Sequence, residues 1–85
     1  MIDIRNNLSL LYDFYIVAKE GNFTRAAEKN FASQSNLSRR VQSLESSLNL
    51  KLINSTNKGI ELTSDGERLF KVVDILISNL ETYNL

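Results

Sequence analysis

Residues 23–42 read FTRAAEKNFASQSNLSRRVQ, and this stretch decides the fold. Thr24 is typical of a helix N-cap, and a short helix is predicted from Arg25 to about Asn30. Phe31-Ala32 then makes a turn, and Ser33 is the N-cap candidate of a longer helix over about 34–48. A short helix, a tight turn and a longer helix predict a helix-turn-helix.

The longer helix has one apolar and one polar face. Its apolar residues, spaced 4, 3 and 4 apart, are Leu37, Val41, Leu44 and Leu48. On the polar side, Arg39 can pair with guanine, while Asn36 and Gln42 can pair with adenine. Gln34 lies near the helix N-terminus, where the helix dipole attracts a phosphate. The short side chains of Ser33, Ser35 and Ser38 let the protein backbone approach phosphates or base edges. A polar face of this kind is also ordinary for a solvated helix, so the face alone leaves DNA contact open.

Outward from this stretch the pattern adds a helix before it and a hairpin after it. Largely apolar residues predict a helix from Leu8 to Glu20 that is covered on more than one side. Asn49 suits a left-handed C-cap of the longer helix. Apolar residues then alternate at period two on either side of the polar stretch 54–59, which predicts a β-hairpin with a loose tip over about 50–62.

Thr63 is the N-cap candidate of a last helix over 64–85. Apolar residues repeat there at heptad spacing, with further apolar residues on both sides of the stripe. The resulting arc of about 220° is wider than one domain core covers, so we expect it to meet a second chain. The predicted dimerisation residues are Leu69, Val73, Leu76, Ile77, Leu80 and Tyr83.

Together these elements predict a mainly α fold, a winged helix-turn-helix. It has a three-helix core, a two-stranded β-hairpin wing and a long C-terminal linker/dimerisation helix. We expect a winged helix-turn-helix DNA-binding domain over 1–63, with the helix-turn-helix at about 23–42 and the wing at about 50–62. The linker/dimerisation helix is expected over 64–85.

Composition excludes several other kinds of protein. The 85 residues contain no cysteine and no histidine, which removes thiolate and imidazole metal ligands and Ser-His or Cys-His catalysis. No phosphate-cradling glycine loop is present, so neither an enzyme, a metal site nor a cofactor is expected. No signal peptide opens the chain and no apolar run approaches the ~20 residues of a membrane span, so we expect a cytoplasmic protein without membrane contact.

The formal net charge is zero, but the charges are unevenly distributed along the chain. Residues 19–58 carry +4, between flanks of −1 over 1–18 and −3 over 59–85. A basic middle segment that contains the helix-turn-helix is a modest indication of an anionic partner.

Two runs, FYIVAKEGNFTRAAE over 14–28 and SQSNLSRRVQSLE over 33–45, resemble the LysR-type transcriptional regulators. The later run GIELTSDG over 59–66 is similar to that family's second wing strand and linker-helix start, and the resemblance covers about 8–80. It implies a bacterial regulator that binds double-stranded DNA sequence-specifically, at the nucleoid, as a homodimer joined through the C-terminal helices. It also implies that a small-molecule effector acts only through a C-terminal domain that is absent here.

The resemblance and the polar face together give the predicted DNA-binding residues. These are Thr24, Arg25, Ser33, Gln34, Ser35, Asn36, Ser38, Arg39, Arg40, Gln42, Asn57 and Lys58. The chain departs from the family pattern at Ser35, where proline is usual, and at Asn49, where glycine is usual. Residues 52–55, Leu-Ile-Asn-Ser, lack the aromatic and the arginine of the family's Leu-Phe-x-Arg segment, which puts its basic contact at the wing base in doubt.

The main alternative is a winged-helix protein-interaction or dimerisation module that does not bind DNA. Neutral net charge and the serine at position 55 are its best support. A gel shift at several salt concentrations separates the two functions, because DNA binding must weaken as counterions compete.

Overall fold

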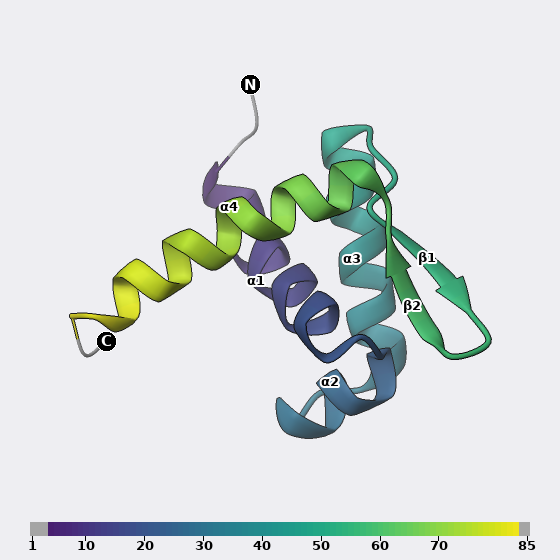
Figure 1. Ribbon diagram of the computed structural model, residues 1–85. Helices are drawn as coiled ribbons and strands as arrows, with labels where there is room; N and C mark the ends of the chain where they lie inside the picture. The colour runs from purple at the N-terminus through teal and green to yellow at the C-terminus, as the bar shows by residue number, and fades with distance from the viewer. Residues whose placement is uncertain (1–3, 84–85) are drawn as a thin grey trace.

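The computed structural model describes residues 4–83, so residues 1–3 and 84–85 of the two predicted regions lie outside the described part. Its elements, in chain order, are α1 (Ile4–Glu20), α2 (Phe23–Lys29), α3 (Gln34–Leu48), β1 (Ile53–Thr56), β2 (Gly59–Leu62) and α4 (Ser64–Glu81). Helices α1, α2 and α3 pack against one another, the antiparallel hairpin lies beside α3, and α4 crosses over α1 (Figure 1). This arrangement confirms the predicted winged helix-turn-helix.

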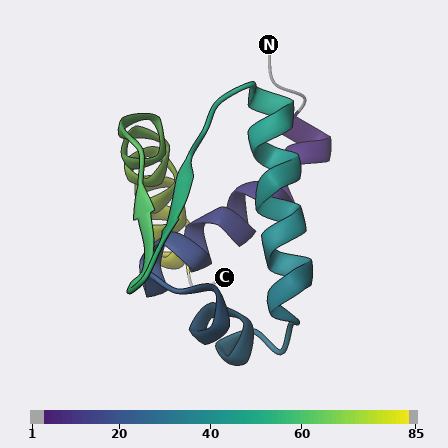
Figure 2. The same ribbon diagram turned by 90° about the vertical axis from the view of Figure 1, so that its right-hand side faces the viewer.

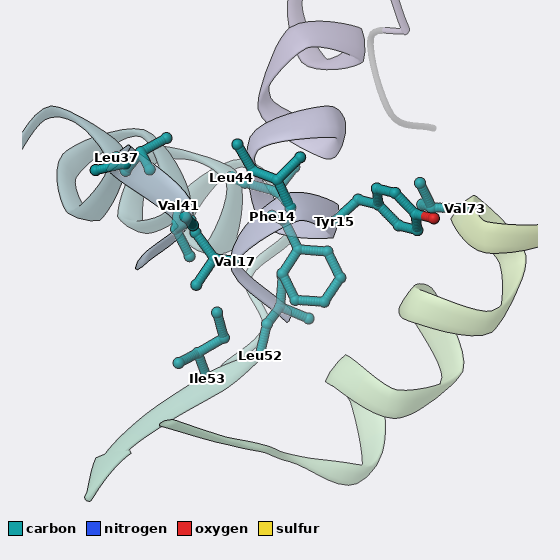
Figure 3. Packing of buried hydrophobic residues seen from close by; sticks show 12 residues of the cluster. Phe14, Tyr15, Val17, Leu37, Val41, Leu44, Leu52, Ile53 and Val73 are labelled. Atoms are coloured by element: carbon teal, nitrogen blue, oxygen red, sulfur yellow. The ribbon is translucent and has the colours of Figure 1, made fainter. Parts of the chain in front are cut away.

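The core lies mainly between α1 and α3. Phe14 and Val17 of α1 meet Leu44 of α3 and Leu52, which precedes the hairpin, and all four side chains are fully buried (Figure 3). The predicted apolar stripe of α3 is confirmed: its first three residues are buried and Leu48 is half-buried against them. Burial of this stripe turns the polar side of α3 outward.

Three of the four predicted helix caps are confirmed. Ser33 accepts a hydrogen bond from the Asn36 amide, at 3.1 Å, and Thr63 accepts one from the Gly66 amide, at 3.0 Å. Asn49 ends α3 in the left-handed conformation, with φ 55° and ψ 43°.

The predicted cap at Thr24 is wrong, because α2 begins two residues earlier than expected, at Phe23 rather than Arg25. The side chain of Asn22 accepts the Arg25 amide at 3.0 Å and so caps the helix at Phe23. Thr24 lies within the first turn of α2, and its hydroxyl donates to the Gln34 side-chain oxygen at 2.9 Å. Helix α1 also begins earlier than expected, at Ile4 rather than Leu8.

The hairpin is shorter and tighter than predicted. Thr56 pairs with Gly59, so only Asn57 and Lys58 form the tip. Strand β1 begins at Ile53, because the amides of Leu52 and Ile53 donate to a side-chain carboxylate on α3. The predicted loose tip over 54–59 is therefore wrong, although the hairpin itself is confirmed.

Helix α4 is anchored to the domain by residues near its middle. The Tyr15 hydroxyl donates to Asp74 Oδ1 at 3.0 Å, and the Tyr15 ring stacks on Phe70 with centroids 5.4 Å apart. The second half of α4 projects beyond the other helices (Figure 1). Among the helices of residues 4–83, none is long and apolar enough to cross a membrane.

Candidate nucleic-acid interface

The outer face of α3 presents polar side chains to solvent. Ser35, Asn36, Arg39 and Gln42 are all exposed, opposite the buried stripe. The Arg39 guanidinium donates to Asn36 Oδ1 one turn earlier, which holds the two side chains together. Arginine and amide groups on an exposed helix face can read base edges in a major groove.

The start of α3 is tied to α2. The Thr24–Gln34 hydrogen bond bridges the two helices on the surface and leaves the Gln34 amide nitrogen able to donate. Arg25 is exposed beside Thr24 on α2, and the Ser33 hydroxyl is engaged in capping. The predicted residues of α2 and of the start of α3 are therefore brought together.

The turn between α2 and α3 carries an unexpected aromatic. Phe31 has φ 54°, in the left-handed region, and its side chain is 99% exposed. The Ala32 amide donates to the Ala27 carbonyl at 3.0 Å and closes the turn. This left-handed conformation at a phenylalanine had no signal in the sequence, because glycine or asparagine is usual there.

Arg40 is held differently from the other predicted residues. Its Nε forms an ion pair with Asp13 Oδ2 of α1, and the Asp13 side chain is largely buried while that of Arg40 is half exposed. Burial raises the pKa of Asp13, and the nearby Arg40 charge opposes that rise. Arg40 thus joins α3 to α1, and only its remaining N–H groups are available to DNA.

The wing lies beside α3 on the same side of the molecule. Figure 2 looks onto this side, with α3 on the right and the hairpin on the left. Asn57 and Lys58 are exposed at the tip of the hairpin. Between α3 and the wing, Ser38 and Gln42 of α3 and Lys51 and Ser55 of the wing line a small hollow of about 50 Å³.

Two residues of this region were missed by sequence reasoning. Glu45 of α3 accepts the amides of Leu52 and Ile53, and Lys51 Nζ lies 3.8 Å from Glu45 Oε1. Lys51 could have been found as a cation at the predicted wing base. Glu45 had no such signal, because its partners lie beyond the end of its own helix.

The predicted dimerisation residues separate into two sets. Val73 is buried in the core of its own chain, and Leu69 and Ile77 are half-buried against that core. The exposed apolar side chains of α4 and of the turn after it are Val72, Ile75, Leu76, Leu80 and Tyr83. A groove of about 700 Å³ runs beside them between α1 and α4, with Tyr12 and Leu80 in its walls.

Within residues 4–83, no group of three or more acidic side chains is placed to hold a metal ion.

A short helix, a tight turn, an outward polar helix and a flanking hairpin define a winged helix-turn-helix protein. Within that class, the sequence model of the bacterial regulatory helix-turn-helix proteins of the lysR family matches residues 8–67. The chain belongs to the lysR family.

Individual relatives agree with this assignment. The chain is 43% identical over 68 residues to the HTH-type transcriptional regulator YofA of Bacillus subtilis, covering 80% of this chain and 24% of YofA. It also matches the glycine cleavage system transcriptional activator of Escherichia coli, with 37% identity over 73 residues that cover 86% of this chain and 24% of the activator. The chain therefore spans about a quarter of the length of these relatives.

Solved structures share both fold and sequence with the chain. The full-length Vibrio cholerae virulence activator AphB superposes with a TM-score of 0.83 at 34% identity, covering 91% of this chain and 27% of AphB. A BenM_DBD/catB site 1 DNA complex superposes with a TM-score of 0.80 at 32% identity, covering 89% of this chain and 82% of the BenM chain.

Proposed function

We propose that this chain binds double-stranded DNA sequence-specifically and regulates transcription as a homodimer. The observation that carries the proposal is the outer face of α3, where Asn36, Arg39 and Gln42 are exposed together. Glu45 is the sole acidic residue of α3, and its carboxylate is turned to the wing amides rather than toward this face. An exposed helix face with donors and without acidic groups suits a groove lined by phosphates.

The comparison with BenM_DBD supports a nucleic-acid ligand, because that relative was solved with DNA and shares 32% of its sequence with this chain. We propose that residues 1–63 form the DNA-binding part and that residues 64–85 form the linker/dimerisation helix. In this arrangement α3 of each subunit enters a major groove, and successive grooves lie about 34 Å apart. Asn57 and Lys58 of the wing then lie near phosphates. At the start of α3, the DNA backbone is contacted by Ser33, Gln34 and Thr24.

We propose that the exposed apolar side of α4, together with the turn that follows it, forms the dimer contact. Val72, Ile75, Leu76, Leu80 and Tyr83 expose an apolar surface there that the domain itself does not cover. Apolar area removed from water is the main favourable term in association, so pairing this surface with a second copy is favourable.

The proposal places the protein at the bacterial nucleoid in the cytoplasm, since its ligand is duplex DNA. We place any response to a small-molecule effector outside residues 1–85. No catalytic activity is part of the proposal, because the lysR family is a family of regulators.

The test is a binding-site selection from random duplexes, followed by gel shifts across a range of salt. We expect an enriched half-site repeated with two-fold symmetry, and a logarithm of the binding constant that falls linearly with the logarithm of salt concentration. A chain that dimerises but shifts no duplex at low salt would support the protein-interaction module instead.

A further inference from the structure

The wing is fastened at its base by one carboxylate of α3. Glu45 Oε2 accepts the Leu52 amide at 2.7 Å and the Ile53 amide at 3.2 Å. The Glu45 side chain is only 11% exposed. These two amides belong to the last residue before β1 and its first residue, so the carboxylate fixes where the strand starts.

Close to its tip, the wing is fastened by a hydrogen bond to the turn between α1 and α2. The Ile60 amide donates to the Gly21 carbonyl, at 3.2 Å, in the turn between α1 and α2. A Cβ placed on Gly59 would lie 2.5 Å from that carbonyl oxygen, and Gly59 has φ 134°. Residue 59 must therefore lack a side chain for the tip to reach the body, and Lys58 is its neighbour in the chain.

Both fastenings connect the wing to the two elements that carry the helix-turn-helix. Glu45 follows Ser38 and Gln42 along one side of α3, and these residues share the hollow between α3 and the wing. Gly21 directly precedes Asn22, the cap of α2. A two-stranded hairpin is marginally stable alone, so contacts of this kind decide where it lies.

We propose that Glu45 and Gly59 are positioning residues that hold the wing cation Lys58 at a fixed place relative to α3 for phosphate contact. The inference rests on the proposed DNA binding and adds residues that do not touch DNA themselves. With the wing already in place, the phosphate contact needs no ordering of the hairpin at the moment of binding.

The Glu45 carboxylate is negatively charged, as is the proposed DNA ligand, and its neighbours offset that charge. Glu45 receives two amide N–H groups and lies 3.8 Å from Lys51 Nζ, which offset its negative charge. Both amides bond to the same oxygen, so glutamine at position 45 can supply the same acceptor without the charge. Glu45→Gln therefore separates the role of this side chain as a hydrogen-bond acceptor from the effect of its charge.

The experiment measures how much Lys58→Ala weakens binding in four backgrounds: the wild-type chain, Glu45→Ala, Glu45→Gln and Gly59→Ala. The probe is a short mixed-sequence duplex, because phosphate contacts carry no sequence information. One phosphate contact contributes a log–log salt slope of about 0.9, which is an affinity loss of about 3.5-fold per subunit between 50 and 200 mM salt.

We expect Lys58→Ala to remove that slope increment in the wild-type and Glu45→Gln backgrounds. In the Glu45→Ala and Gly59→Ala backgrounds the increment should already be lost, so Lys58→Ala should change neither the affinity nor the slope. Ile16→Ala, which removes buried α1 side-chain volume next to the groove between α1 and α4, controls for lower stability and should preserve the full Lys58 effect.

An undiminished Lys58 effect in the Glu45→Ala and Gly59→Ala backgrounds would overturn the positioning role. Loss of the effect in Ile16→Ala would overturn it too, because general destabilisation would then explain the coupling. A different result, in which Lys58→Ala has no effect even in the wild-type chain, would instead refute the wing contact of the proposed function.

Discussion

Substitution of Leu80 by lysine should dissociate the proposed dimer. Leu80 lies on the projecting half of α4 and is 43% exposed in the single chain. The proposed contact buries this remaining surface against a second copy, so a lysine there would place a hydrated charge in an apolar interface. We expect Leu80→Lys to be monomeric at concentrations where the wild-type chain is dimeric.

The size of the effect follows from the exposed fraction. Full burial of a leucine side chain is worth about 1.5–3 kcal/mol, so the 43% still exposed on Leu80 corresponds to about 0.6–1.3 kcal/mol. A two-fold interface contains the residue twice, which gives about 1.3–2.6 kcal/mol and a dimer dissociation constant weaker by about 10- to 80-fold. The ammonium group adds to this loss unless its long stem carries it back to solvent.

Sedimentation equilibrium over a concentration series measures the dissociation constant directly. Leu50→Lys is the matched control, because Leu50 is 41% exposed but lies between α3 and β1 rather than on α4. Thermal unfolding of both variants checks that the helices remain formed. An intact dimer for Leu80→Lys, or equal dissociation of both variants, would refute an α4 interface.

Four further outcomes are expected. Arg39→Ala should cost about 1–3 kcal/mol per half-site and relax base preference there, and an unchanged result in binding-site selection would leave Arg39 only a phosphate role. Ser55→Arg should strengthen binding to any duplex and steepen the salt dependence by roughly one log–log unit per subunit; identical slopes would mean that residue 55 does not reach the DNA backbone. Phe31→Asn should raise the free energy of unfolding by about 1 kcal/mol in urea titrations, because asparagine tolerates the left-handed backbone, without changing DNA affinity. Asp13→Asn should not reduce the free energy of unfolding at neutral pH, because burial raises the folded-state pKa of Asp13 above its unfolded value and ionisation therefore costs stability as the pH rises above that unfolded value. A clear loss of stability in urea titrations at neutral pH would show that the ion pair with Arg40 outweighs burial.

Much of the fold could be predicted because it depends on local patterns. The spacing of Leu37, Val41 and Leu44 identified the buried face of α3, and the structure buries all three. Ser33 and Thr63 were recognisable as caps because each precedes a helical pattern with a side-chain oxygen. Such features depend on residues within one or two turns of each other, which a single sequence contains in full.

The features that could not be predicted depend on long-range contacts or on competition between neighbours. Asn22 and Thr24 are both acceptable caps, and the Thr24 hydroxyl is engaged with Gln34, which lies ten residues later. Glu45 reaches amides seven and eight residues beyond it, across the end of its helix. The division of the α4 stripe was also hidden, because periodicity alone does not tell which apolar residues face α1.

The zero net charge does not argue against DNA binding once the positions of the charges are known. Four ion pairs occur among the described residues, and each engages an acidic side chain: Asp13, Glu20, Glu45 and Asp65. Within the same described part of the chain, none of those pairs involves Arg25, Arg39 or Lys58. Salt screens charges beyond about 10 Å, so a phosphate at the interface responds to these nearby cations more than to distant acidic residues of α4. The local charge of the α3 and wing surface, rather than the sum over 85 residues, is therefore the quantity that bears on the proposed ligand.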